Sequence, residues 1–268
     1  MTTLGIAQAR FGSSRLPGKV LEPIGGTPML RWSLDRLAAA STIDRVVLAT
    51  TTERSDDPVA RLAEDLGFEV VRGSVFDVLD RFHDALQAHP DADVIVRITA
   101  DCPFLDPALV DDVVDLLRRR GADFASNRLP PPFPRTYPVG LDVEACTRAA
   151  LETAWRDATA KHHREHVMPY LYESTGLFSV ALLDLEEDLS SYRWTVDTPR
   201  DLAAARAIAD RLTPGDLSWR SILAIVGADP ALRELNAMEE QKTLGATDTR
   251  WAAGANRDPS RGLGRRDA

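Results

Sequence analysis

A short segment near the N-terminus combines small residues with three cationic side chains. It extends from Ala7 to Lys19 and contains Gly12, two serines, and the cations Arg10 and Arg15. Small residues let backbone N–H groups approach an anion closely, and guanidinium and ammonium groups pair with phosphate oxygens. The segment follows a short apolar run, so it indicates a polyphosphate site at the end of a first strand. A solvated basic turn is the alternative, since such loops are common on protein surfaces. The spacing matches neither a Walker loop nor the G-x-G-x-x-G dinucleotide fingerprint.

Two aspartates follow other runs of strand length. Asp101 comes shortly after an apolar run at 93–98, and Asp197 comes directly after a run at 192–196. Open parallel sheets bind ligands beyond the carboxyl ends of their strands, and Mg²⁺ prefers carboxylate and phosphate oxygens. Both aspartates are therefore candidate Mg²⁺ ligands beside the cationic segment. Thr198 suits a helix N-cap, so an interaction with the start of that helix is the alternative for Asp197.

Polar residues in the second half of the chain form two further candidate sets. Asp142 and Glu144 lie two residues apart in an expected strand at 140–144, which places both carboxylates on one face. They are expected to contact substrate hydroxyls or to help hold a metal; solvated acids on an edge strand are the alternative. His162 and His166 have the i, i+4 spacing of a zinc pair, but a polar helix start is the preferred interpretation.

Charged residues also mark the starts of two expected helices. Asp106 precedes Pro107, a combination typical of an N-cap followed by the first helical residue, so a structural role is expected for it. Arg81 admits two interpretations. It either faces a bound nucleotide or forms an ion pair with Asp77 on the same helix.

The elements that must position these residues alternate in type along the chain. This βαβα order predicts an α/β fold of three layers, with a mostly parallel sheet and right-handed crossovers. In the first half, strands are expected at 4–9, 45–50, 69–72, 93–98 and 122–125, and helices at 28–40, 57–66, 75–88 and 107–120. After a proline-rich loop at 127–138, strands are expected at 140–144, 178–183 and 192–196, and helices at 148–158, 162–172, 199–212 and 219–226.

Composition narrows the function classes. The chain has 268 residues and a net charge of −9, which argues against nucleic-acid binding through a general basic surface. Its two cysteines, Cys102 and Cys146, form no metal-type or disulfide pattern, and no apolar run is long enough for a membrane span. We expect a cytoplasmic protein with no membrane or nucleic-acid partner. One α/β domain is expected at 1–240, followed at 241–268 by a flexible basic tail; a basic arm that binds a partner is the alternative for the tail.

Nine segments, taken together and in order, resemble a known family, the CMP-sugar synthetases. The closest resemblance is to the spore-coat polysaccharide cytidylyltransferases of the SpsF type, and it covers about residues 3–212. The segments that carry it are Gln8–Leu21, Ala49–Thr52, Asp56–Pro58, Arg72–Ser74, Asp77–Phe82, Arg97–Pro103, Thr136–Glu144, Arg164–Val167 and Arg193–Pro199.

The resemblance implies a Rossmann-like, GT-A-like nucleotide-diphospho-sugar transferase fold. It also implies Mg²⁺-dependent transfer of CMP from CTP to an acidic sugar or similar acid, with release of pyrophosphate, and a homodimer. A transferase that uses another nucleoside triphosphate remains an alternative, as does a nucleotide-binding regulatory protein without turnover. Val139 departs from the family, where many members carry a polar or charged residue, and so do the proline-rich insertion at 130–134 and the tail.

The resemblance also implies roles for individual residues, in three groups. Residues expected to hold the triphosphate are Arg10, Ser14, Arg15 and Lys19, and those expected to border the base and ribose are Thr50, Arg81, Thr99 and Ala100. The expected nucleotide-binding set also contains Ala7, Ala9, Gly12 and Asp101. Residues expected at the acceptor are Tyr137, Asp142, Glu144 and His166. Asp101 and Asp197 are expected to hold Mg²⁺, and the catalytic set is Arg10, Arg15, Lys19 and Asp101.

Overall fold

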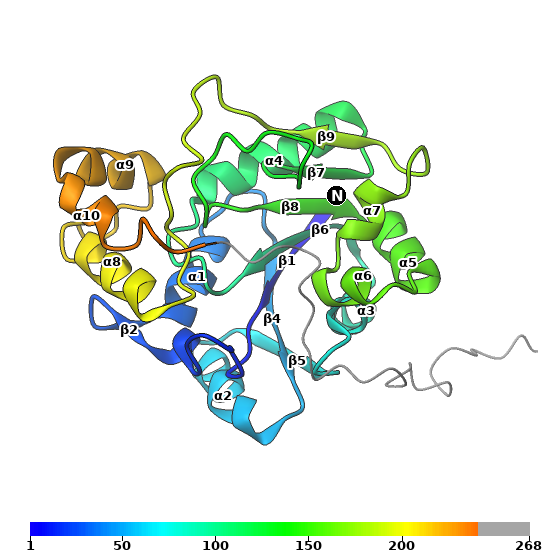
Figure 1. Ribbon diagram of the computed structural model, residues 1–268. Helices are drawn as coiled ribbons and strands as arrows, with labels where there is room; N and C mark the ends of the chain where they lie inside the picture. Colours follow the sequence, from blue (N-terminus) through cyan, green and yellow to red (C-terminus); the bar gives the residue numbers. More distant parts are fainter. Residues whose placement is uncertain (241–268) are drawn as a thin grey trace, which may run out of the picture.

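A seven-stranded sheet forms the centre of the molecule in a computed structural model that describes residues 1–240 (Figure 1). Its strand order is β5-β4-β1-β6-β8-β7-β9, and β2 and β3 form a separate hairpin. The strands are β1 (Thr2–Gln8), β2 (Pro23–Ile24), β3 (Thr27–Pro28), β4 (Arg45–Thr51), β5 (Glu69–Gly73), β6 (Ala92–Thr99), β7 (Phe124–Ser126), β8 (Glu144–Thr147) and β9 (Val180–Leu182). The helices are α1 (Met29–Ala38), α2 (Asp57–Asp65), α3 (Val78–Ala88), α4 (Pro107–Arg120), α5 (Arg148–Asp157), α6 (Lys161–His166), α7 (Pro169–Glu173), α8 (Pro199–Ala209), α9 (Trp219–Ala228) and α10 (Pro230–Glu234).

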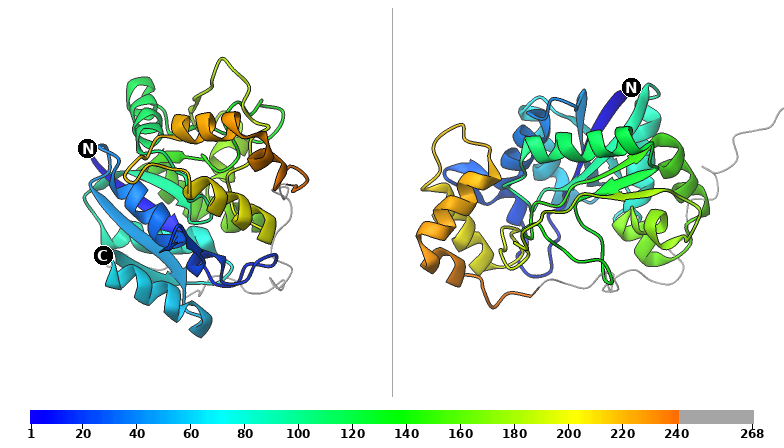
Figure 2. Two further views of the ribbon diagram at one scale, coloured as in Figure 1. Left: turned by 90° about the vertical axis from the view of Figure 1, so that its left-hand side faces the viewer. Right: turned by 90° about the horizontal axis from the view of Figure 1, so that it is seen from above.

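Helices cover both faces of the sheet, as the continuous apolar strands require. Leucines of α1 and the valines of α4 pack in one apolar cluster, whereas α3, α5 and α7 contribute to a second one. Helices α8 to α10 extend the first cluster and lie on the side of the molecule away from α5 to α7 (Figures 1 and 2). The expected three-layer α/β fold is therefore confirmed.

Most of the sheet is parallel, and β8 is the exception. The pairs β5–β4, β4–β1, β1–β6 and β7–β9 are parallel, but β8 runs antiparallel to both β6 and β7. Because β8 is reversed, its first residue lies at the edge where the parallel strands end. This reversal brings Glu144 opposite Arg97 of β6.

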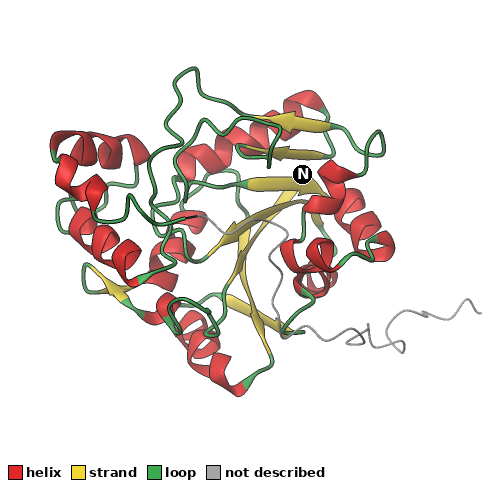
Figure 3. Ribbon diagram, in the orientation of Figure 1, coloured by secondary structure: helices red, strands yellow, loops and turns green. Residues whose placement is uncertain are grey.

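Two expected strands are loops instead (Figure 3). The strand expected at 140–144 begins only at Glu144, because the side chain of Asn127 takes up the backbone groups before it: its amide nitrogen donates to the Leu141 carbonyl (2.8 Å), and its oxygen accepts from the Val143 N–H (2.9 Å). The segment 192–196 makes a single bridge to Val139 and otherwise follows no neighbouring strand.

The helix expected at 162–172 is also interrupted. Val167 has a φ of 71°, and it separates α6 from α7. Pro169 begins α7 and has no N–H with which to continue the preceding helix. The helix α10 and the β2–β3 hairpin were not expected from the sequence.

Gly140 allows two of these loops to touch, and the contact is testable. Its φ is 105°, and a Cβ at this position would lie 2.5 Å from the Thr195 nitrogen. We expect Gly140→Ala to lower the free energy of unfolding in urea by about 2 kcal/mol or more, because both the backbone angle and the clash are unfavourable. Gly176→Ala is the matched control, since its φ is 77° but nothing lies within 4 Å of the added Cβ. Equal losses in the two variants would contradict this explanation.

Candidate active site

A cleft of about 820 Å³ lies where β1 and β6 end, and it collects most of the expected site residues. The cationic segment after β1 forms one wall of the cleft. The end of β6 and the segment 139–144 also line the cleft. Residues from α3, α6 and α7 complete the lining, together with Thr195 and Asp197. A binding site at the carboxyl ends of parallel strands is the usual position in this class of fold.

The loop after β1 is held in shape by its own backbone. Both Ser13 and Gly18 donate their N–H to the Phe11 carbonyl, each at 2.8 Å, and the Phe11 N–H donates to the Asp56 carboxylate. Gly18 has a φ of 73°, and a Cβ there would lie 2.8 Å from the Phe11 ring. The loop therefore closes on Phe11 and leads directly into Lys19.

Lys19 reaches across the cleft to both candidate metal ligands. Its Nζ lies 2.7 Å from Oδ2 of Asp101, 2.8 Å from Oδ1 of Asp197, and 2.7 Å from the Val196 carbonyl oxygen. Burial acts to lower the pKa of Lys19, but the two carboxylates outweigh it and hold that pKa above its ordinary value. Burial likewise acts to raise the pKa of Asp101, and the Lys19 ammonium reverses the direction. Three oxygen atoms thus converge on one cation.

Asp197 has two further cationic partners. Arg15 lies 2.7 Å and Arg193 3.0 Å from its Oδ2 atom. Thr198 and Asp201 form the capping box of α8, which confirms the expected N-cap at Thr198. The alternative for Asp197, an interaction with the start of this helix, is wrong, because its carboxylate faces the cations of the cleft.

Arg193 and the buried Asp201 fix the position of Asp197 from the interior side of the cleft. Arg193 Nε lies 2.9 Å from Asp201, and Asp201 accepts the Asp197 N–H at 2.9 Å and the Asn236 amide at 2.9 Å. Burial acts to raise the pKa of Asp201, but hydrogen bonds from Arg193 and Asn236 keep it below its ordinary value. Sequence reasoning missed this support, although Arg193 lies within one of the recognised segments.

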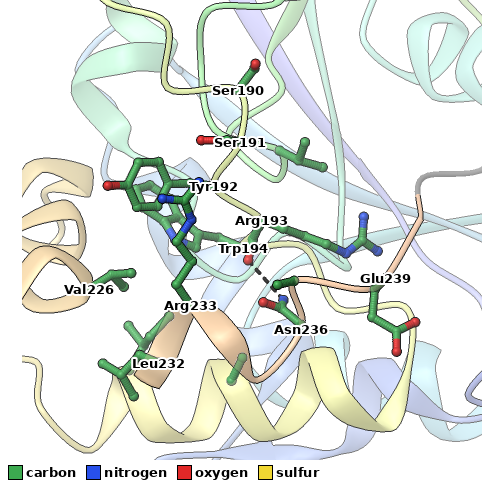
Figure 4. A pocket seen from close by; sticks show the side chains of 14 residues that line it. Ser190, Ser191, Tyr192, Arg193, Trp194, Val226, Leu232, Arg233, Asn236 and Glu239 are labelled. Carbon is green, nitrogen blue, oxygen red and sulfur yellow. Dashed lines mark hydrogen bonds between the residues drawn. The ribbon is translucent and has the colours of Figure 1, made fainter. Parts of the chain in front are cut away.

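A second, smaller pocket lies on the other side of Arg193 (Figure 4). Its volume is about 160 Å³, and it is enclosed by the loop at 190–194 and by α8 to α10. The guanidinium of Arg233 lies over the Tyr192 ring at 4.8 Å, and Asn236 donates to the Arg193 carbonyl. The pocket is too small for a nucleotide, and its residues fix Arg193 in place.

At the other end of the cleft, each expected acid is paired with an arginine. Arg97 forms an ion pair with Glu144, and Arg135 holds both oxygens of Asp142 at 2.7 and 2.8 Å. Burial acts to raise the pKa of Asp142, but Arg135 keeps it low. The edge-strand alternative is wrong, because Glu144 is buried in β8 between two other strands, and Asp142 lies before the strand.

The histidines do not form the i, i+4 pair. His166 lines the cleft, whereas His162 and His163 both contact the Glu173 carboxylate at 2.8 Å. The interpretation of Arg81 as an ion-pair partner of Asp77 is also not supported, because Asp77 is paired with Arg164 at 2.8 Å. Arg81 is buried, donates to the Ala49 carbonyl and lines the cleft.

The structure brings most of the expected residues together. Those that line the cleft are Ala9, Arg10, Gly12, Ser14, Arg15, Lys19, Arg81, Thr99, Asp101, Asp142, Glu144, His166 and Asp197. Ala7, Thr50 and Ala100 are buried and are not among the residues that line it. Tyr137, expected at the acceptor, packs against Trp219 instead, because its ring belongs to the apolar cluster under α9.

Several residues that line the cleft were not expected. Arg97, Cys102 and Thr195 lie inside the segments that resemble the family, so the resemblance could have identified them as site residues. Arg128 and Tyr172 lie outside those segments, and no spacing pattern in the sequence marks them. Asp106 is the N-cap of α4, as expected, and it also accepts the Trp219 N–H at 2.8 Å.

The hydrogen bonds of Asp201 predict a pH-dependent stability. We expect Asp201→Asn to lower the free energy of unfolding at pH 7 by about 2 kcal/mol or more, because the charged partner of a buried arginine is lost. The low pKa of Asp201 stabilises the fold above the unfolded-state value of about 3.9, and this contribution is lost as pH falls below it. Denaturation at pH 7 and pH 3 should therefore show a smaller difference in the variant.

Asp35→Asn is the control for that measurement. Asp35 also pairs with an arginine, Arg31, but both side chains are about half exposed. A loss below about 0.5 kcal/mol is expected for it. A loss for Asp201→Asn no larger than this would contradict the assignment.

No helix within residues 1–240 is long and apolar enough to cross a lipid bilayer. The expected tail at 241–268 lies outside the described residues.

Comparison with known proteins places the chain in a family. A family model described as "Cytidylyltransferase" matches residues 4–243. The spore coat polysaccharide biosynthesis protein SpsF of Bacillus subtilis is 31% identical over 235 residues, which cover 85% of this chain and 95% of SpsF. The structure of a cytidylyltransferase from Leptospira borgpetersenii superimposes with a TM-score of 0.79 at 32% identity, covering 90% of this chain and 98% of that one.

A more distant structure shares the fold. A CMP:2-keto-3-deoxy-manno-octonic acid synthetase complexed with CTP superimposes with a TM-score of 0.60 at 18% identity, covering 79% of this chain and 100% of that one. The expected nucleotide-diphospho-sugar transferase fold is confirmed. The chain belongs to the cytidylyltransferase family and is a CTP-dependent nucleotidyltransferase.

Proposed function

We propose that this protein transfers CMP from CTP to a small acidic sugar and releases pyrophosphate, with Mg²⁺ as the metal. The observation that carries the proposal is the convergence of Asp101 and Asp197 on the Lys19 ammonium beside an arginine-rich loop. The names of two similar proteins support the substrates: SpsF belongs to polysaccharide biosynthesis, and the octonic acid synthetase was solved with CTP.

The donor set fits a divalent metal. Two carboxylates and a backbone carbonyl already surround one positive charge at hydrogen-bonding distances. The Lys19 ammonium therefore occupies the position that a metal ion would take. Oxygen ligands of this kind suit Mg²⁺. Asp101 and Asp197 would hold the ion, which would supply charge neutralisation at the phosphates and would favour the ionised form of the attacking oxygen.

The residues of the chain position the reacting groups and balance their charge. An acceptor oxygen forms a bond to the α-phosphorus of CTP, the bond to the oxygen shared with the β-phosphate breaks, and pyrophosphate leaves with that electron pair. The proton of an acceptor hydroxyl passes to water. Arg10, Arg15 and Lys19 would bind the leaving pyrophosphate, and Arg81 would border the nucleotide. In this proposal Asp142, Glu144 and His166 face the acceptor.

Pyrophosphate release tests the reaction. We expect release from CTP with acidic sugars such as 3-deoxy-manno-octulosonate and N-acetylneuraminate, and a decrease of about 100-fold or more for Asp101→Asn, because a ligand of the charge-stabilising ion is lost. Asp115→Asn, at an exposed position on α4, is the control. Full turnover by Asp101→Asn would contradict the metal role.

Nucleotide choice and turnover are separated by two further readouts. Among CTP, UTP, GTP and ATP, we expect CTP to raise the melting temperature most, since a tightly bound ligand stabilises the folded state. An equal or larger shift with another nucleotide would favour the alternative transferase. Binding of CTP without pyrophosphate release for any acceptor would favour the regulatory protein.

The position of Lys19 predicts that metal binding depends on nucleotide. Without CTP, an incoming ion must displace the ammonium from Asp101 and Asp197, whereas bound phosphates offer Lys19 other partners. We therefore expect Lys19→Met to bind Mn²⁺, in the absence of nucleotide, at least about 10-fold more tightly than the wild type, measured by electron paramagnetic resonance. The double variant Lys19→Met, Asp101→Asn should lose this gain. Equal affinities for the wild type and Lys19→Met would contradict the prediction.

A further inference from the structure

Charge in the cleft is distributed differently from charge in the whole chain. Six cationic side chains and five carboxylates line it, although the chain carries a net charge of −9. Four of the carboxylates have assigned partners: Asp101 and Asp197 contact Lys19, Glu144 contacts Arg97, and Asp142 contacts Arg135, a cation outside the lining set. The acids at the acceptor end are thus already neutralised by their own arginines.

Arg128 is an additional cation at that end. Five arginines line the cleft, and Arg128 is the one whose guanidinium makes no hydrogen bond or ion pair with the residues described, 1–240. Its backbone is fixed on both sides by Ser126, whose hydroxyl accepts the Arg128 N–H at 3.0 Å and contacts the Arg128 carbonyl at 2.8 Å. The neighbouring Asn127 and Leu129 are buried, so the segment is anchored while the side chain of Arg128 faces the cleft.

Tyr172, on α7, lines the same cleft as Arg128. Burial and the Glu144 carboxylate raise the pKa of Tyr172, and the positive charge of Arg128 opposes them. The phenol is therefore neutral at physiological pH and can donate a hydrogen bond. Its ring packs against Phe124 of β7, and within the described part of the chain its hydroxyl has no hydrogen-bond partner.

Sheet order separates Arg128 from the cationic loop after β1. Arg128 follows β7, which is three strands away from β1 in the order β1-β6-β8-β7. With neighbouring strands about 4.8 Å apart, the end of β7 lies about 14 Å across the sheet from the end of β1. Arg128 is therefore placed at the end of the cleft where Glu144 lies, away from the loop after β1.

We propose that Arg128 and Tyr172 bind the carboxylate of the acidic acceptor and so select acids over neutral sugars. A guanidinium presents parallel N–H donors that match the two oxygens of a carboxylate, and the phenol adds a third donor. The proposal rests on the proposed function, because it assigns a role within the same cleft. It adds two residues to those expected at the acceptor, neither of which belongs to the recognised segments.

The test compares an acid with its neutral counterpart. With the enzyme saturated by the non-transferable analogue cytidine 5′-(α,β-methylene)triphosphate, binding of 3-deoxy-manno-octulosonate, N-acetylneuraminate and glucuronate is measured by titration calorimetry, each against its methyl ester. We expect the wild type to prefer at least one acid, and Arg128→Gln to weaken that acid by about 10- to 100-fold while leaving its ester unchanged. Arg128→Lys should recover part of the loss because it keeps the charge, and Tyr172→Phe should weaken the acid by a smaller factor.

Two controls keep the result specific. Affinity for the nucleotide analogue should stay within about twofold of the wild type in every variant, which shows that the cleft is intact. Arg120→Gln removes an exposed arginine at the end of α4 and should change nothing. Equal affinity of Arg128→Gln and wild type for the acid, or a wild type that binds no acid more tightly than its ester, overturns the proposal. Failure of the proposed function is distinct, since it shows as an absence of pyrophosphate release from CTP with acid and neutral acceptors alike.

Discussion

The ion cluster centred on Lys19 is the interaction on which the rest of the site depends. Asp101 and Asp197 come from segments far apart in the sequence, and both are largely buried. Two carboxylates close together repel each other unless a cation lies between them, and burial strengthens that repulsion. Lys19 supplies the cation from a third segment. Its side chain therefore connects the loop after β1 to the two segments that carry Asp101 and Asp197. Arg193 and Asp201 extend the cluster into the interior, where Arg193 pairs with both Asp197 and Asp201.

The sheet was predictable from the sequence to the extent that local patterns determine it. The strands β1, β4, β5 and β6 are short runs rich in apolar residues that alternate with helices along the chain. The helix expected at 107–120 has those bounds in the structure because Asp106 caps it and Gly121 ends it. One strand prediction failed because a side chain replaces strand pairing. At 141–143 the amide of Asn127 satisfies the backbone, an arrangement that no periodicity in the sequence reveals.

The site was predictable where several segments of the sequence independently indicated binding of phosphate or metal. The cationic loop, Asp101 and Asp197 were each ambiguous alone, and the expectation that strand ends meet at one edge brought them together. Partners of the acids were not predictable, because Arg97 pairs with Glu144 only through the antiparallel register of β6 and β8. Tyr137 shows the opposite error: it lies in a recognised segment, but the fold turns its ring into the apolar cluster beside Trp219.

The contact at Gly140 has a consequence for engineering and for evolution. The loop at 139–143 and the loop at 193–197 touch backbone to backbone, and Val139 exchanges hydrogen bonds with Tyr192 and Trp194. One loop carries Asp142, and the other carries Asp197. Grafting a single loop from a relative would therefore separate two surfaces that fit each other at atomic contact. Chimeras that exchange both loops as one unit preserve this fit, and we expect natural divergence within the family to have altered the two loops in concert.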